Sequence, residues 1–126
     1  MFKDFVESLQ TTVSESRKKN LTIAFVSDSK MRRLNRTFRG KTGTTDVLSF
    51  SFVPDEFDSN EDYLGEIIIS AEQAARQAKE NHLTLEHEIK QLILHGVLHL
   101  CGYDHETDSG EMNARELEIR DQLGIS

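Results

Sequence analysis

The stretch from residue 84 to residue 100 places the strongest constraint on how this chain can fold. Thr84 is a suitable helix N-cap, and the apolar residues after it recur at intervals of three and four, as on one broad face of an α-helix. These residues are Ile89, Leu92, Ile93, Gly96, Val97 and Leu100. A face this wide has to be covered by other parts of the chain, so we predict a central helix.

Four further segments have the pattern of helices. Apolar spacing from Phe2 to Val13 predicts an amphipathic helix that runs to about Lys18. Ser27 or Asp28 is suited to cap a short helix, and Ser70, with Gln73 three residues later, begins another that runs to about residue 81. A final amphipathic helix ends near residue 124.

Three apolar runs at residues 21–26, 47–53 and 64–69 predict strands. Interleaved with the helices, they favour an α+β fold in which a small mixed sheet of about four strands is flanked by helices. At 126 residues the chain suits a single domain, 1–126. It has neither a run of ~18 apolar residues nor a secretion signal in MFKDFVESLQ, and its one cysteine, Cys101, agrees with a reducing compartment. We therefore expect a cytoplasmic protein that has no membrane partner.

Three of the five histidines fall within HGVLHLCGYDH, at residues 95–105. His95 and His99 lie one turn apart on the predicted central helix, and Gly102 allows a turn that would carry His105 back toward them. Three imidazoles are a usual protein ligand set for a catalytic zinc ion, which keeps its fourth position open. The alternative is that the first two are core histidines satisfied by backbone groups. The combined spacing favours a metal site on the central helix and the following loop.

The same spacing matches the metzincin proteases, whose pattern is H-E-x-x-H-x-x-G-x-x-H. In those enzymes the glutamate after the first histidine is the general base, and here that position is Gly96. A peptide hydrolase would lack its proton acceptor, which makes a metallohydrolase of peptides or other small substrates the less favoured interpretation. A charged substrate such as a phosphodiester suits the remaining site better.

Residues 30–41 hold six basic side chains and no acidic one, although the formal net charge of the chain is −7. An acidic protein repels polyanions unless its cations are gathered, as they are here. Arg39 is suited to bidentate hydrogen bonds with phosphate. A charge run of this kind is often only a solvated helix face, but beside a metal motif it favours a polyanion-binding patch. The other members of this patch are Lys30, Arg32, Arg33, Arg36 and Lys41.

Four segments together resemble one known family. HGVLHLCGYDH resembles the H-G-x-L-H-L-x-G-Y-D-H signature of the YbeY family of bacterial endoribonucleases, also called rRNA maturation factors. Upstream, LNRTFR at 34–39, TDVLSF at 45–50 and GEI at 65–67 resemble that family's L-N-x-x-[YF]-R, T-[ND]-V-L-S-F and G-[DE]-I segments, in the same order. The loop KTGT at 41–44 departs from the usual charged and proline-containing loop.

The resemblance implies a single-strand-specific, metal-dependent endoribonuclease that hydrolyses RNA phosphodiesters. Its role would be in processing of the 3′ end of small-subunit (16S) rRNA and in ribosome quality control. The resemblance implies that His95, His99 and His105 hold one zinc ion, or another divalent transition metal, and that Arg39 is the functional arginine. The implied partners are single-stranded rRNA and the ribosome or its small-subunit proteins.

Other residues are candidates for supporting roles. Glu66 and Asp104 are candidates for handling protons or orienting a ligand, and Ser49 and Thr45 for contacting substrate. We expect Cys101 to act as a small buried hydrophobe. The attacking group, a metal-activated hydroxide or the 2′-hydroxyl of the RNA, is left open. The alternative function is a ribosome-associated RNA-binding maturation factor with a mainly structural zinc.

Overall fold

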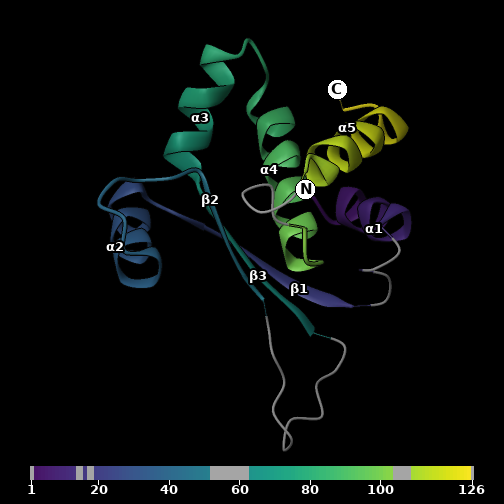
Figure 1. Ribbon diagram of the computed structural model, residues 1–126. Coiled ribbons are helices and arrows are strands. Elements are labelled where there is room, and N and C mark those ends of the chain that lie inside the picture. Colours follow the sequence, from purple (N-terminus) through teal and green to yellow (C-terminus); the bar gives the residue numbers. More distant parts are fainter. Residues whose placement is uncertain (1, 14–15, 17–18, 52–62, 104–108, 126) are drawn as a thin grey trace, which may run out of the picture.

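The computed structural model describes residues 2–13, 16, 19–51, 63–103 and 109–125. Within these ranges the chain forms helices on both sides of one small sheet (Figure 1). The order of elements is α1 (Lys3–Thr12), β1 (Asn20–Val26), α2 (Asp28–Arg39), β2 (Val47–Ser51), β3 (Tyr63–Ser70), α3 (Ala71–Glu80), α4 (Leu85–Leu100) and α5 (Glu111–Leu123). The predicted α+β class is confirmed. No helix in these ranges is long and apolar enough to cross a membrane.

The sheet has the strand order β1-β3-β2, so β3 is central and β2 is an edge strand. β1 runs parallel to β3 and pairs Ile23 with Ile67, whereas β2 is antiparallel and pairs Ser49 with Ile67. The sheet is mixed, as predicted, but three strands form in the described residues where we expected about four. Only three runs of strand-forming residues lie outside the helical segments, and each forms one strand.

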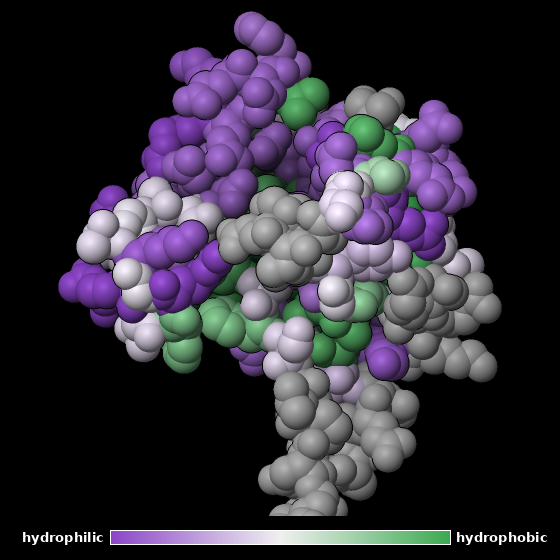
Figure 2. Space-filling model, viewed as in Figure 1, coloured by the Kyte–Doolittle hydropathy of each residue, from purple (hydrophilic) through white to green (hydrophobic). Residues whose placement is uncertain are grey.

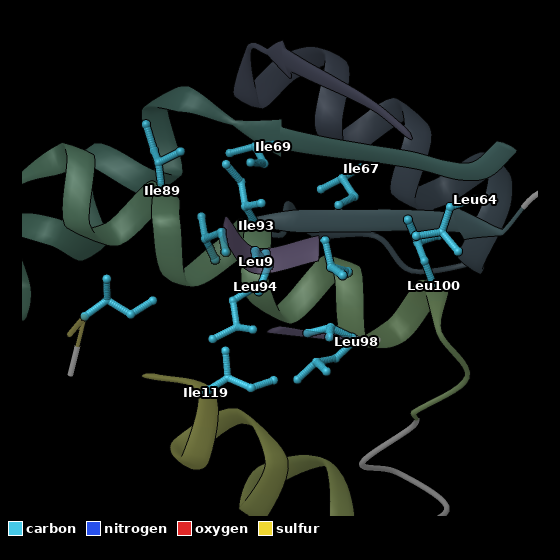
Figure 3. Packing of buried hydrophobic residues seen from close by; sticks show 14 of the residues in the cluster. Leu9, Leu64, Ile67, Ile69, Ile89, Ile93, Leu94, Leu98, Leu100 and Ile119 are labelled. Carbon is cyan, nitrogen blue, oxygen red and sulfur yellow. The ribbon is translucent and has the colours of Figure 1, made fainter. Parts of the chain in front are cut away.

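The predicted central helix is α4, which packs against one face of the sheet. The helix approaches the sheet closely at Gly96, where a Cβ atom would lie 2.9–3.0 Å from side-chain carbons of Ile67. On the side away from the sheet, α1 and α5 cover α4 (Figure 1). Figure 3 shows Ile119 of α5 close to Leu94 of α4. The main core therefore lies around α4.

The opposite face of the sheet is covered by α2, which buries Met31 and begins at the predicted N-cap Ser27. Asp28, in its first turn, is buried and accepts a hydrogen bond of 2.6 Å from the Ser70 hydroxyl at the end of β3. Asp28 also pairs with Arg76 of α3, and its backbone N–H donates to Glu72 Oε1 at 3.0 Å. The Ser70 hydroxyl and the Arg76 guanidinium lower the pKa of Asp28. This network fixes α2 to the end of the sheet.

Element boundaries differ from the prediction at two places. α1 ends at Thr12 instead of about Lys18, because Val13 takes an extended conformation with φ −90° and ψ 93°. The hydroxyls of Thr11 and Thr12 donate to carbonyl oxygens one turn earlier, an arrangement that slightly destabilises a helix. β2 ends at Ser51, and the last two residues of the predicted strand lie outside the described residues.

Candidate active site

A cleft of about 510 Å³ lies along the edge strand β2, where the end of α2 and the histidines of α4 meet. Its walls come from segments far apart in the sequence: the end of α2, the following loop, β2 and α4. The lining residues are Phe38, Arg39, Lys41, Thr45, Asp46, Val47, Leu48, Ser49, Phe50, His95 and His99. The fold thus brings six residues that the sequence singled out into one cleft.

His95 and His99 project from α4 one turn apart, as the spacing predicted. Their ring centroids are 4.8 Å apart, and the ring planes meet at 69°. The His95 side chain keeps 29% of its surface exposed, so one part of the ring is covered by the protein and another faces the cleft. Two imidazoles at this separation are suited to bind the same small ligand.

His95 is held from behind by Glu116 of α5, a residue that the sequence reasoning missed. The His95 Nδ1 atom lies 3.3 Å from Glu116 Oε1, and Glu116 Oε2 lies 3.6 Å from the Arg120 guanidinium. An ionised carboxylate only accepts hydrogen bonds, so this contact favours the tautomer that carries its proton on Nδ1. The signal was present in the spacing: Glu116 lies between the buried Met112 and Ile119, on the inward face of α5.

The donor set suits a zinc ion, because a carboxylate behind a histidine orients its other ring nitrogen toward a metal. His95 and His99, two of the three predicted ligands, both line the cleft. His105 and Asp104 lie outside the described residues. No group of three metal-binding side chains occurs within the described ranges, so the three-histidine metal site stays a prediction. Cys101 is half-buried and packs against the core, as expected of a small hydrophobe.

Gly96 faces the sheet and does not line the cleft. A Cβ at this position would lie 2.9 Å from Ile67 Cγ2, closer than carbon atoms pack in proteins. The chain therefore has a packing reason for glycine where the metzincin pattern has glutamate. A longer side chain here would push against β3, so position 96 is unsuited to a general base in this fold.

Arg39 reaches the cleft because α2 ends there. Gly40 adopts a φ of 66° and closes the helix with a hydrogen bond to the Arg36 carbonyl, after which the chain turns toward β2. This loop is anchored, since Asn35 Nδ2 donates to the Gly43 carbonyl at 2.8 Å. The anchored loop carries Lys41 and Thr45 into the cleft wall. The other predicted cations are exposed on α2 outside that wall: Lys30, Arg32, Arg33 and Arg36.

Two other predicted residues, Ser49 and Glu66, lie on opposite faces of the sheet. Ser49 pairs with Ile67 and shares the face that α4 covers, and it lines the cleft. Glu66 pairs with Phe50 one residue away, so it projects from the opposite face, and it is exposed. Glu66 is therefore placed across the sheet from the two histidines.

A smaller hollow of about 220 Å³ adjoins His95 on the side of Glu116 and Arg120. Glu88 of α4 lines it and is buried, with 5% of its surface exposed. Burial raises the pKa of the Glu88 carboxyl, and the nearby Asp46 carboxylate raises it further. With its amide oriented to suit both neighbours, Gln77 donates to Glu88 Oε1 at 3.0 Å and to Asp46 Oδ2 at 3.2 Å. The sequence reasoning also missed this group.

Comparisons with known proteins point to one family. A family model described as Endoribonuclease YbeY matches residues 1–124. Proteins named Endoribonuclease YbeY from Alkaliphilus metalliredigens, Thermodesulfovibrio yellowstonii and Koribacter versatilis are 43%, 43% and 46% identical. The matches cover 83%, 78% and 82% of this chain, and 71%, 62% and 64% of those relatives. The chain thus spans about two thirds of their length.

A protein of Thermotoga maritima with a known solution structure has a similar fold. The two superpose with a TM-score of 0.65 at 30% identity, over 98% of this chain and 81% of the other. The match of the family model to nearly every residue, the similarity to proteins of that name and the shared fold lead to one conclusion. The chain belongs to the YbeY family of endoribonucleases.

Proposed function

We propose that this protein is a metal-dependent endoribonuclease that hydrolyses phosphodiester bonds in single-stranded RNA. The observation that carries the proposal is the cleft in which Arg39 and Lys41 lie across β2 from the pair His95 and His99. Cations that bind phosphate and imidazoles that bind a metal can then contact the same phosphodiester group of the substrate. Membership of the YbeY family supports RNA as that substrate.

His95 and His99, with His105 as the third ligand, would hold one zinc ion or another divalent transition metal. When bound, the metal supplies Lewis-acid polarisation of a phosphoryl oxygen. Glu116 keeps the Nδ1 proton of His95 in place, so that Nε2 is available as a ligand. The residues therefore fit the metal that the sequence predicts.

Arg39 binds the phosphate on the other side of the cleft. Its planar guanidinium donates parallel hydrogen bonds to two phosphate oxygens and neutralises charge that develops there during cleavage. Lys41 adds a second positive charge on the same wall, and the hydroxyls of Ser49 and Thr45 are suited to sugar or phosphate oxygens. The exposed cations of α2 extend the positive surface beyond the cleft, which favours a strand longer than the reacting phosphodiester.

The biological role follows the family. We propose that the substrate is the precursor of small-subunit (16S) rRNA, processed at its 3′ end in the cytoplasm, and that the same activity serves ribosome quality control. The ribosome or its small-subunit proteins would present the substrate. Cells that lack the protein should accumulate 16S precursors with extended 3′ ends, and normal ends in such cells would contradict this role.

Two variants with matched controls test the enzyme proposal. Arg39→Ala should lower the rate of single-stranded RNA cleavage about 10²–10³-fold while zinc content is retained. Lys79→Ala, at an exposed cation of α3 outside both the cleft and the basic patch, should cleave at nearly the wild-type rate. His99→Ala should lose both zinc and cleavage, whereas His82→Asn, at an exposed position with φ 57°, should lose neither.

The same experiment separates the main alternative, an RNA-binding maturation factor with a structural zinc. That protein would bind single-stranded RNA and hold stoichiometric zinc but would not cleave. Cleavage that is unchanged in Arg39→Ala would remove this arginine from the reaction. Peptides are included as substrates, because hydrolysis of peptides alone would favour a different metallohydrolase.

A further inference from the structure

Phe38 is the most exposed large hydrophobic side chain in the described part of the chain, with 62% of its surface accessible. It precedes Arg39 at the end of α2 and lines the cleft. The other large hydrophobic side chains that are exposed there, Phe25, Leu85 and Leu117, lie outside the cleft wall. A single exposed hydrophobic side chain is common on protein surfaces, so what distinguishes Phe38 is its position in the cleft beside Arg39.

The ring of Phe38 is supported from one side. Phe50 of β2, which is half-buried, meets it edge to face, with centroids 5.2 Å apart and planes at 70°. This contact braces Phe38 against the sheet while most of its surface stays accessible. Figure 2 shows a small hydrophobic area next to the hydrophilic surface over α2.

We propose that Phe38 is the stacking platform for one nucleobase of the single-stranded RNA, next to the phosphate that Arg39 holds. The proposal rests on the proposed function and names how that site recognises its substrate. Because Phe38 and Arg39 both line the cleft, the ring and the guanidinium are placed to bind the base and the phosphate of neighbouring parts of one strand. Single-stranded RNA is commonly held in this way, by cations on the backbone and aromatic rings on the bases.

This arrangement discriminates against duplex RNA. A base inside a helix has both faces covered by its neighbours, so it reaches the ring only after unstacking, which costs free energy. Every base has a stackable face, so the platform selects for an unpaired base and tolerates its identity. Phe38 thus supplies selectivity for single strands without sequence readout.

The absence of tryptophan from the chain provides a direct test. Phe38→Trp introduces a single tryptophan, whose fluorescence should be quenched when a base stacks on it. The matched control is Phe25→Trp, which places the reporter at a side chain that is 46% exposed on β1, outside the cleft. Each protein is mixed with a short oligoadenylate in a stopped-flow instrument and observed before turnover. We expect quenching in the first variant only, and none with a hairpin duplex of equal length.

Kinetics provide the second arm. Phe38→Ala should raise KM for the oligoadenylate about tenfold with little change in kcat, and Phe38→Tyr should restore most of the lost affinity. An oligonucleotide with one abasic position at the platform should bind wild type and Phe38→Ala equally well. Sensitivity that persists with this substrate would overturn the assignment, because the ring would then act on something other than a base.

Failure of the inference differs from failure of the proposed function. Suppose that wild type cleaves RNA, and that either Phe38→Ala has the same KM as wild type or Phe38→Trp shows no quenching. Base stacking on Phe38 is then wrong, and the proposed nuclease function is unaffected. If RNA quenches Phe38→Trp but no variant cleaves, the platform stands and the protein is a binding factor. Quenching by a protein partner without RNA would show that the ring is a protein contact and would overturn the platform.

Discussion

Replacing Gly96 by alanine tests the packing that sets α4 against the sheet. The added methyl would lie 2.9 Å from Ile67 Cγ2 and 3.0 Å from Cγ1 and Cδ1. Packed carbon atoms lie about 3.5–4.0 Å apart, so α4 and β3 must separate by roughly 0.5–1 Å. Ile67 is fully buried in the central strand and is branched at Cβ, which leaves it little freedom to move aside.

Two opposing effects set the size of the change. Overpacking of a core costs about 1–3 kcal/mol, whereas alanine in place of glycine favours a helix by about 1 kcal/mol. We therefore expect Gly96→Ala to lower the free energy of unfolding by about 1 kcal/mol in urea denaturation. Gly43→Ala is the control: a Cβ there meets nothing within 4 Å, so that variant should gain stability, by about 0.4–1 kcal/mol.

A double variant isolates the contact. In an Ile67→Ala background the carbons that crowd the methyl are gone, so Gly96→Ala should there raise stability by about 1 kcal/mol. The argument is refuted if Gly96→Ala is as stable as wild type, or if the two substitutions are additive. Gly96→Glu should destabilise the fold more strongly and should not confer peptidase activity, because the position faces Ile67.

Two other substitutions probe the groups behind the histidines. Glu116→Gln should weaken zinc binding about 10–100-fold in a competition titration, because the hydrogen-bond acceptor that orients His95 Nδ1 is weakened. Glu118→Gln, at an exposed position on the same helix, should leave zinc affinity unchanged. Equal zinc affinities of Glu116→Gln and wild type would mean that Glu116 does not orient His95. Since burial raises the pKa of Glu88, the stability contributed by its neutral form is complete at acid pH and is lost as pH rises through the folded-state pKa. Glu88→Gln should remove that decline, and parallel stability curves for the two proteins from about pH 4 to pH 8 would contradict it.

Those parts of the site whose positions depend on a local sequence pattern could be predicted from the sequence. The i, i+4 spacing of His95 and His99 and the capped start of α2 each depend on neighbours within one helix. Helical periodicity therefore placed both imidazoles on one face and Arg39 at a helix end. Family signatures added the expectation that these two segments act together.

The sequence could not show which side of each strand or helix packs against which neighbouring element. Within β3 the run Ile67 to Ile69 is apolar on both sides, because helices cover both faces of the sheet, so its pattern does not alternate there. The three isoleucines do not themselves say which side faces α4, and the structure places Ile67 on that side. The partnership of Glu116 with His95 likewise depends on how α5 lies against α4, which is a tertiary property.

The edge strand β2 has a consequence for self-association. In the described residues it pairs with β3 on one side only, and its other side borders the cleft. Such an edge is a template on which a second chain can add a strand. Arg39 and Lys41 stand beside it, so two copies that approached edge to edge would bring four positive charges together. The cations proposed to attract RNA would thus also oppose the pairing of two copies through this edge.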